Sequence, residues 1–239
     1  MIELNNISKS FGNTHALKNV SMHLKAGKCF GLIGPNACGK TTIIKSILNM
    51  VVPSAGSILF DGKSIKGDVS YKNHIGYMPQ IGRYPENMSI IQVIDMIKSI
   101  RQFDGQTDEE LWDAFGLEQA KHKKMRTLSG GTTQKVSATL AFLFSPDVLI
   151  LDEPTAGLDP LASEILREKI IMERQKGKLI LITSHLLNEL DDLLTDVIYM
   201  QDGKIVFFKT TDELMAMSGH GRISKAIGHY IKSAAVRIK

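Results

Sequence analysis

The sequence predicts an α/β protein with a mostly parallel sheet, an N-terminal antiparallel β subdomain and an inserted, mostly helical lobe. Apolar runs bounded by Gly, Asn or Asp alternate with helical stretches over much of the 239 residues, which is the pattern of α/β layers. Runs such as VLILD and LILIT are apolar without alternation, as expected for parallel strands buried on both faces. Between about residues 83 and 145 the strands stop, and SIIQVIDMIKSI and TDEELWDAFGL show helical spacing.

The expected elements follow the chain in a simple order. The strands are 2–8, 20–24, 28–34, 56–60, 74–79, 147–152, 178–183, 196–200 and 204–208. The first helix is expected over 41–50, and the lobe of about 83–145 interrupts the strands. The chain contains no internal repeat and no low-complexity linker, so we expect residues 1–239 to form a single module that ends in a basic tail, 219–239.

Composition bounds the compartment and the partners. Hydrophobic residues make up 43% of the chain and charged residues 23%, which is ordinary for a protein with a buried core. Two cysteines are too few for a disulfide framework, which favours a reduced, cytoplasmic compartment. No apolar run reaches the ~20 residues that span a bilayer, so any association with a membrane is expected to be peripheral. The tail has five Lys or Arg and no carboxylate; it is either a solvated end or a contact for anionic lipid or nucleic acid.

A phosphate-binding loop follows the third expected strand. GPNACGKT, from Gly34 to Thr41, matches G-x-x-x-x-G-K-[ST] between an apolar strand and a helix. The loop amides and the helix N-terminus would bind the phosphates of ATP, Lys40 would bridge the β- and γ-phosphates, and the Thr41 hydroxyl would bind Mg²⁺. The predicted nucleotide-binding residues here are Gly34, Pro35, Asn36, Ala37, Cys38, Gly39, Lys40, Thr41 and Thr42.

DVLILDEP supplies a second anchor for the metal. The apolar strand ends at Asp152, which would hold Mg²⁺, and Glu153 follows, where it would polarise the attacking water. The alternative is that the two carboxylates only cap a loop.

Five motifs then occur in a fixed order: GPNACGKTT, YMPQ, LSGGTTQKV, LILDEPTAGLDP and ITSH. In this combination the chain resembles the nucleotide-binding subunit of ATP-binding cassette (ABC) transporters, from about Ile2 to Phe208. The resemblance implies a P-loop NTPase core and an ATPase that acts through motion.

The resemblance also implies roles for three further side chains. Phe11, in KSFGN, occupies the position at which the family stacks an aromatic ring on adenine; the alternative is a core phenylalanine at a strand end. Gln80 matches the glutamine that reaches the Mg²⁺ and the water. His185 matches the histidine that bonds the γ-phosphate.

LSGG lies outside the lysine-bearing loop, and the resemblance explains its place. In the family two copies face head to tail, and the LSGG of one closes over the ATP bound by the other. Asp159 would lie along the same seam, and the residues implied to act on the partner's nucleotide are Ser129, Gly130, Gly131 and Thr132. The alternative is an ordinary helix N-cap made by Ser129, with glycines for turn freedom.

The chain departs from the family pattern at three positions. Ala37 replaces a frequent glycine; if its φ is positive the residue costs roughly 1 kcal/mol, and we expect a tolerable geometry in which ATP still binds. Cys38 is expected to serve as a small residue, with redox sensing as the alternative. Thr132 replaces a frequent glutamine, and its shorter side chain makes its contacts in trans less certain.

Hydrolysis without an acceptor implies mechanical output to an integral membrane permease subunit, which the family docks on the helical lobe. We expect Tyr84, Met88 and Ile91 either to form that contact or to pack inside the lobe. The short chain and TAGLDP are similar to ATPases of ABC-2-type exporters and, more faintly, to the ATPase of the copper-processing transporter that matures nitrous oxide reductase. Two rival functions are a soluble ABC-type ATPase acting on ribosomes or nucleic acid, which usually carries two cassettes or a coiled-coil insert, and a small-molecule P-loop kinase, which would leave LSGG unexplained. We therefore do not expect nucleic acid as a partner.

Overall fold

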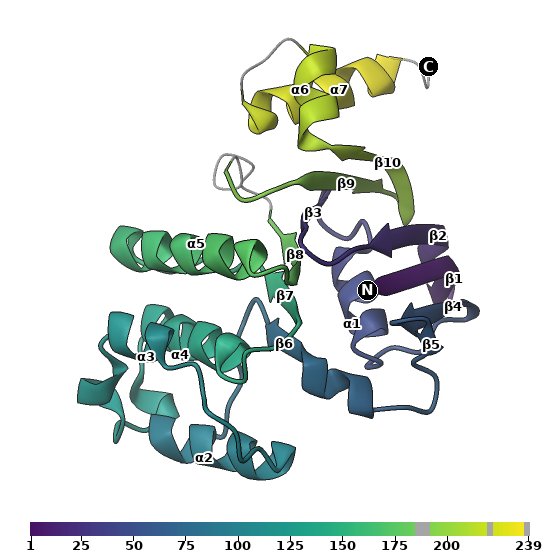
Figure 1. Ribbon diagram of the computed structural model, residues 1–239. Helices are drawn as coiled ribbons and strands as arrows, with labels where there is room; N and C mark the ends of the chain where they lie inside the picture. Colours follow the sequence, from purple (N-terminus) through teal and green to yellow (C-terminus); the bar gives the residue numbers. More distant parts are fainter. Residues whose placement is uncertain (185–191, 219–221, 237–239) are drawn as a thin grey trace. The chain divides into compact units, whose positions relative to one another are not determined.

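A computed structural model describes residues 1–184, 192–218 and 222–236, with the side chains of 218 and 231–236 left aside. The chain divides into two compact units (Figure 1). The first unit comprises residues 1–69 and 181–239, and the second comprises residues 70–180. Each unit carries a different part of the predicted site.

The first unit begins with an antiparallel sheet, in the order β2-β1-β4-β5. Its strands are β1 (Ile2–Phe11), β2 (Thr14–Leu24), β4 (Ala55–Phe60) and β5 (Lys63–Ser64). β1 pairs with both β2 and β4, and its buried residues alternate with exposed ones over Ile2–Leu4. The predicted N-terminal antiparallel subdomain is confirmed; β5, which has only two residues, was not predicted.

The remaining strands of the first unit belong to the mostly parallel sheet. They are β3 (Cys29–Ile33), β9 (Asp196–Gln201) and β10 (Lys204–Thr210), accompanied by α1 (Lys40–Ile47), α6 (Thr211–Ser218) and α7 (Ile223–Val236). β3 pairs in parallel with β9, and β9 pairs antiparallel with β10. All five residues of β3 are buried, as the unbroken apolar run predicts. The Tyr230 ring packs edge-on against Phe207, with 4.6 Å between centroids, and so ties α7 to β10.

The second unit holds the helical lobe between two parallel strands. Its elements are β6 (Ile75–Met78), α2 (Ile90–Arg101), α3 (Glu110–Ala114), α4 (Gly130–Phe142), β7 (Val148–Asp152), α5 (Pro160–Gln175) and three 3₁₀ turns (Ser70–His74, Leu117–Ala120, Met125–Thr127). β6 pairs with β7 from Ile75↔Val148 to Met78↔Leu151. β8 (Leu179–Thr183) runs through the boundary between the units and is buried along its length.

The expected helix over 107–117 is shorter in the structure. α3 covers only Glu110–Ala114. The Asp108 side chain accepts a hydrogen bond from the Glu110 amide at 3.2 Å, and the Thr107 hydroxyl donates to Glu109 at 2.9 Å. These short-range bonds favour a non-helical conformation of residues 107–109, because short polar side chains compete with the helix for backbone partners.

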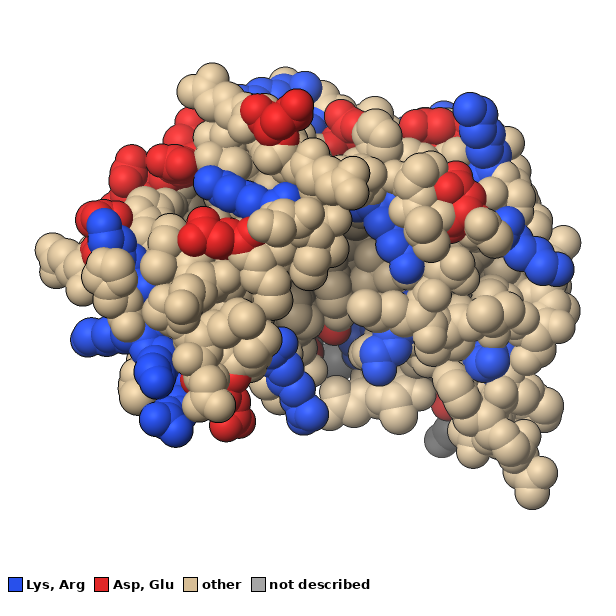
Figure 2. Space-filling model, turned by 90° about the horizontal axis from the view of Figure 1, so that it is seen from below, with Lys and Arg blue, Asp and Glu red and all other residues tan. Residues whose placement is uncertain are grey.

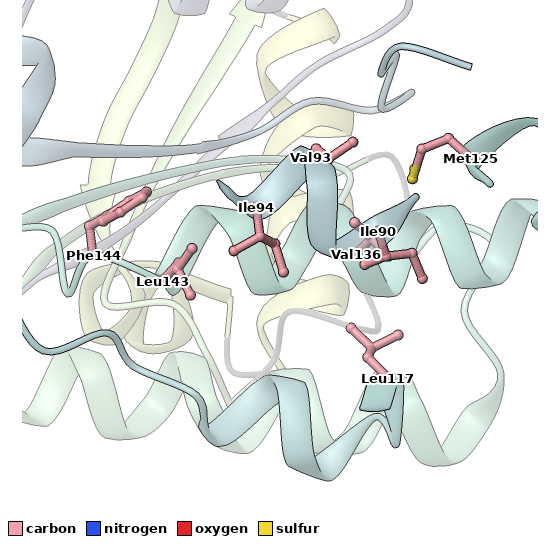
Figure 3. Packing of buried hydrophobic residues seen from close by; sticks show 8 residues of the cluster. All are labelled: Ile90, Val93, Ile94, Leu117, Met125, Val136, Leu143 and Phe144. Atoms are coloured by element: carbon pink, nitrogen blue, oxygen red, sulfur yellow. The ribbon is translucent and has the colours of Figure 1, made fainter. Parts of the chain in front are cut away.

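A small core holds the lobe together (Figure 3). Its buried members come from α2, α4 and the turns between them: Ile90, Val93, Ile94, Leu117, Met125, Val136, Leu143 and Phe144. Tyr84 and Met88 pack against this cluster, and the Tyr84 hydroxyl donates to Ser137 Oγ at 3.0 Å. For these two residues the structure supports the alternative of packing inside the lobe, although both side chains remain partly exposed.

One face of the molecule shows how charge is distributed over the described residues (Figure 2). Lys and Arg side chains are interspersed there with Asp and Glu and with uncharged surface. None of the described helices is long and apolar enough to cross a membrane.

Candidate nucleotide-binding and catalytic site

The phosphate loop of the first unit lies between β3 and α1. The Lys40 ammonium donates to the carbonyl oxygens of Gly34, at 2.7 Å, and Pro35, at 3.0 Å. These bonds hold the ammonium against the loop to which a triphosphate would also bind. A cation at that place can bind the β- and γ-phosphate oxygens with little movement of its side chain.

The start of α1 offers further donors for an anion. Its N-cap is Gly39, at φ 112°, and this residue supplies no side-chain cap. The first amides of a helix have no intrahelical acceptor, so those of Lys40, Thr41 and Thr42 are suited to phosphate oxygens. Only glycine fits at position 39, because an added Cβ would lie 2.7 Å from the Ala16 carbonyl oxygen.

Ala37 adopts the conformation for which we predicted a cost. Its φ is 61°, in the left-handed region that glycine occupies freely and alanine only at a cost of roughly 1 kcal/mol. This value lies within the narrow left-handed region allowed to L-residues, so the geometry is tolerable but strained. Cys38, in contrast, is 3% exposed, and a Cβ at Gly34 would lie 2.7 Å from its sulfur. Cys38 thus fills the small space beneath the loop.

Phe11 ends β1 and is exposed over 51% of its surface. The alternative of a core phenylalanine is therefore wrong. The Lys9 ammonium lies 5.1 Å from the centroid of the ring. The structure thus leaves an aromatic face available to a flat ligand on the first unit.

Asp152 ends β7 in the second unit, and Glu153 follows it. Asp152 is 7% exposed because it still belongs to the buried strand, whereas Glu153 is half-buried. Glu153 has a φ of 51°, which is uncommon for a residue other than glycine. Such strained backbone concentrates at functional sites, where the surroundings hold it in place.

Gln80 and Glu153, 73 residues apart in the chain, are brought together. The Gln80 Nε2 donates to Glu153 Oε2 at 3.2 Å. The bond uses an N–H of the amide, and the Gln80 Oε1 oxygen is the atom of this side chain that can bind a cation. Gln80 of YMPQ and Glu153 of LDEP were both expected to contact the attacking water. The structure shows that the two side chains are in direct contact within the second unit.

The pKa of Tyr77 is affected by one of these carboxylates. Burial raises the pKa of Tyr77 to about 12, and the negative charge of Asp152 adds to the increase. The negative charge of Asp152 therefore acts on the phenol of Tyr77, two residues after the start of the neighbouring strand β6.

The LSGG turn begins α4. Ser129 is the N-cap, and its Oγ accepts from the Thr132 amide at 3.2 Å and lies 2.9 Å from the Thr132 hydroxyl. The N-cap alternative is therefore correct about Ser129, although a cap does not exclude a further contact. Turn freedom for the two glycines is not needed, because Gly130 and Gly131 are part of the helix.

The two glycines differ in what surrounds them. A Cβ added at Gly130 would meet nothing within 4 Å, whereas one at Gly131 would lie 3.0 Å from the Gly157 carbonyl oxygen. Glycine at a helical position costs about 1 kcal/mol relative to alanine. Packing within the second unit explains that cost at Gly131 but not at Gly130.

Asp159 is the N-cap of α5. Its Oδ1 accepts from the Ala162 amide at 2.9 Å, and its Oδ2 lies 2.7 Å from the Lys135 ammonium. The hydrogen bond from Lys135 is the largest cause that lowers the pKa of Asp159, followed by the Ala162 amide. Lys135 was missed by the sequence analysis, although it lies four residues after Gly131 and helical spacing puts both on one face of α4.

His185 lies outside the described residues. The other predicted side chains divide between the units: the loop Gly34–Thr42 and Phe11 belong to the first, and Gln80, Asp152, Glu153, the LSGG turn and Asp159 belong to the second.

Comparison with known proteins identifies relatives along nearly the whole chain. A family model for the ABC transporter matches residues 17–156. Lantibiotic transport ATP-binding protein SrtF of Streptococcus pyogenes is 32% identical over 212 residues, which cover 89% of this chain and 92% of that protein. Osmoprotectant import ATP-binding protein OsmV of Salmonella typhimurium is 31% identical over 243 residues, which cover 95% of this chain and 63% of that protein.

Solved structures agree with these relatives. The structure of an ATP-binding subunit of an ABC transporter has a TM-score of 0.86 at 25% identity and covers 96% of this chain and 98% of that chain. A bacterial ABC transporter cassette solved as a dimer has a TM-score of 0.78 at 22% identity, covers 88% of this chain and 98% of that chain, and so shows the same fold. A chain with these relatives and this arrangement of loop, carboxylates and LSGG turn belongs to the ABC transporter family, as an ATP-hydrolysing nucleotide-binding subunit.

Proposed function

We propose that two copies of this chain bind ATP between them head to tail, the phosphate loop of one copy facing the LSGG turn of the other. The observation that carries this proposal is Gly130. It is a glycine although its surroundings in the second unit have room for a side chain. A ligand that approaches the backbone from outside explains why no side chain is present there.

The same turn has the chemistry for a phosphate. Ser129 is exposed, and the amides of Gly130 and Gly131 are the first two of α4, without intrahelical acceptors. A helix N-terminus also favours negative charge through its dipole. No lysine is needed at this turn, because Lys40 of the other copy accompanies the same γ-phosphate.

The residues present fit Mg²⁺. Thr41, Asp152 and the Gln80 Oε1 atom offer only oxygen donors, which is the set that Mg²⁺ prefers. When bound, the ion would neutralise the charge on the β- and γ-phosphates. We propose these three residues as its protein ligands.

Glu153 is the proposed base for hydrolysis. Its carboxylate would accept the proton of a water that attacks the γ-phosphorus, while the bond from that phosphorus to the β-phosphate oxygen breaks. Gln80 would hold the carboxylate through the 3.2 Å bond. His185 is proposed to bond the γ-phosphate, and Phe11 to stack on the adenine, where a ring–base contact contributes about 1–3 kcal/mol.

We propose that ATP hydrolysis by this chain drives a separate membrane permease of the ABC-2 exporter type. The chain would then be peripheral, at the inner face of the membrane. SrtF is a lantibiotic transport protein and OsmV an import protein, so the relatives support the role of an ATP-binding subunit for transport in general. With Tyr84 packed inside the lobe, the contact is better placed on Ile81, which is 70% exposed next to Gln80. Loss of transport on Ile81→Asp, with ATP hydrolysis retained, would support this contact.

Glu153→Gln tests the dimer and the base together. The amide keeps the shape of the side chain but cannot accept the proton, so hydrolysis should fall at least about 100-fold while ATP is still bound. With ATP and Mg²⁺ the variant should elute as a dimer in size-exclusion chromatography, and without nucleotide as a monomer.

Two results would contradict the proposal. Hydrolysis at the wild-type rate would show that Glu153 is not the base. A variant that binds ATP but stays monomeric at every concentration would contradict the shared site. Glu164→Gln, an exposed carboxylate on α5, is the matched control and should behave as the unmodified chain.

A further inference from the structure

The LSGG turn touches the loop that follows β7, and one of these contacts is backbone against backbone. We call Glu153–Asp159 the exit loop. The Gly131 Cα faces the Gly157 carbonyl oxygen so closely that an added Cβ would lie 3.0 Å from it. α4 and the exit loop therefore meet without an intervening side chain at this point.

The second contact is an ion pair one helical turn further along α4. The Lys135 ammonium lies 2.7 Å from Asp159 Oδ2, with 23% of the lysine side chain and 51% of the aspartate side chain exposed. Lys135 also lies 5.9 Å from the centroid of the Phe115 ring. The other Asp159 oxygen accepts from the Ala162 amide, so the carboxylate that Lys135 binds is itself fixed to α5.

Two short-range backbone hydrogen bonds lie in the exit loop, between these contacts and the proposed base. The Ala156 amide donates to the Glu153 carbonyl at 3.1 Å, and the Leu158 amide donates to the Thr155 carbonyl at 3.1 Å. Two successive turns thus connect Asp159 to Glu153. A displacement of Asp159 would be transmitted to the base over only six residues.

We propose that Lys135 is a positioning residue that holds the LSGG turn and Asp159 as one body, so that both reach the nucleotide of the neighbouring copy together. The proposal rests on the head-to-tail dimer proposed above. Partly exposed ion pairs contribute little to the stability of a folded chain. The effect is expected in dimer formation, where an exit loop that is already ordered has less conformational freedom to lose.

The test uses the full chain with Glu153→Gln and measures the ATP concentration at which half of it is dimeric. Lys135→Met should raise that concentration about threefold to tenfold, because two exit loops per dimer must then be ordered on association. ATP binding to the monomer and the thermal unfolding midpoint should stay unchanged. Lys135→Arg should leave that ATP concentration close to the value for Glu153→Gln alone, because arginine keeps the cation.

Lys121→Met is the matched control, because Lys121 pairs with Glu118 in the same lobe away from the exit loop. A midpoint for Lys135→Met equal to that of Lys121→Met would overturn the inference, and so would failure of Lys135→Arg to restore it. If Glu153→Gln itself never dimerises, the proposed function fails instead.

Asp159→Asn supplies a second route that does not depend on how Lys135→Met folds. The amide oxygen keeps the cap on α5 but loses the charge. If Lys135 acts through Asp159, adding Lys135→Met to Asp159→Asn should shift the dimer midpoint no further. Additive shifts would show that Lys135 acts elsewhere.

Discussion

At the scale of single residues, the site is built from backbone conformations that most side chains avoid. Ala37 and Glu153 both have positive φ, one in the phosphate loop and one at the proposed base. Each is held by its neighbours: Ala37 by a loop whose carbonyls bind Lys40, and Glu153 by the bond from Gln80. The strain at Ala37 is the easier of the two to measure, because its side chain is exposed and has no predicted role of its own.

Ala37→Gly should relieve that strain without changing the chemistry of the loop. We expect the Kd for ATP to tighten by at most about fivefold, since the strain is roughly 1 kcal/mol and is already present before binding. Isothermal titration calorimetry measures this change.

Ser145→Gly is the matched control, with φ 46° on the other unit. It should affect unfolding to a similar extent and leave ATP binding alone. Tightening by Ala37→Gly of a hundredfold would show that the strain governs binding and that the alanine geometry is not tolerable.

At the scale of elements, a buried charge network joins α5 to the turn before α3. Lys169 is 1% exposed and its ammonium binds Asp108, at 2.6 Å, Glu110 and Glu173. Burial alone would lower the pKa of Lys169, but its three carboxylate partners raise it to about 12. The three carboxylates lie close enough to hold a metal ion, but each of them already binds the Lys169 ammonium.

Lys169→Met should destabilise the chain by up to about 3 kcal/mol, because it takes the cation from Asp108 and one of three lysine partners from the buried Glu173. Urea denaturation followed by circular dichroism measures the loss. Lys176→Met removes a half-exposed lysine that binds the same Glu173, and it should cost no more than about 1 kcal/mol. Equal effects of the two variants would contradict a central role for Lys169.

Glu173 makes the same network sensitive to acid. Burial would raise its pKa, but hydrogen bonds from Lys176, Lys178 and Lys169 outweigh burial and lower the pKa to about 2. A folded-state pKa below the unfolded value contributes stability that is complete above the unfolded pKa and is lost as the pH falls towards the folded one. The contribution of Glu173 should therefore be lost between about pH 4.5 and pH 2.

Thermal unfolding across that range tests the prediction. Glu173→Gln should be less stable than the unmodified chain at pH 7, and the difference should shrink as the pH falls below about 4.5. A difference that stays constant down to pH 2.5 would show that the charge of Glu173 does not contribute.

At the scale of the whole molecule, the active assembly is proposed to need two copies, since one chain has one lysine loop and one LSGG turn. In a head-to-tail pair each site takes its loop from one copy and its turn from the other. Two chains inactivated at different motifs should then complement each other, because the mixed pair keeps one site with both motifs intact.

Mixing Lys40→Ala with Gly130→Glu tests this arrangement. Each variant alone should hydrolyse almost no ATP, whereas an equal mixture should recover about a quarter of the wild-type rate if pairs form at random and sites act independently. Gly130→Glu should fold, because the position is open. No recovery in a mixture that still forms dimers would mean that each site lies within one chain.

The sequence by itself determined the features that depend on residues close together in the chain. The apolar runs of β3, β7 and β8 and the glycine pattern of the phosphate loop depend on neighbouring residues, so strands, loop and family were predictable. The roles proposed for Lys40, Asp152 and Glu153 come from motifs at the ends of such strands or just after them.

Only the tertiary structure decided which side chains meet across long separations. The bond from Gln80 to Glu153, the packing of Tyr84 against the lobe core and the ion pair of Lys135 with Asp159 join segments far apart in the chain. The sequence likewise left the sign of φ at Ala37 open, and the folded loop sets it to 61°. Such contacts depend on how folded elements pack, and no local pattern encodes the packing of one element against another.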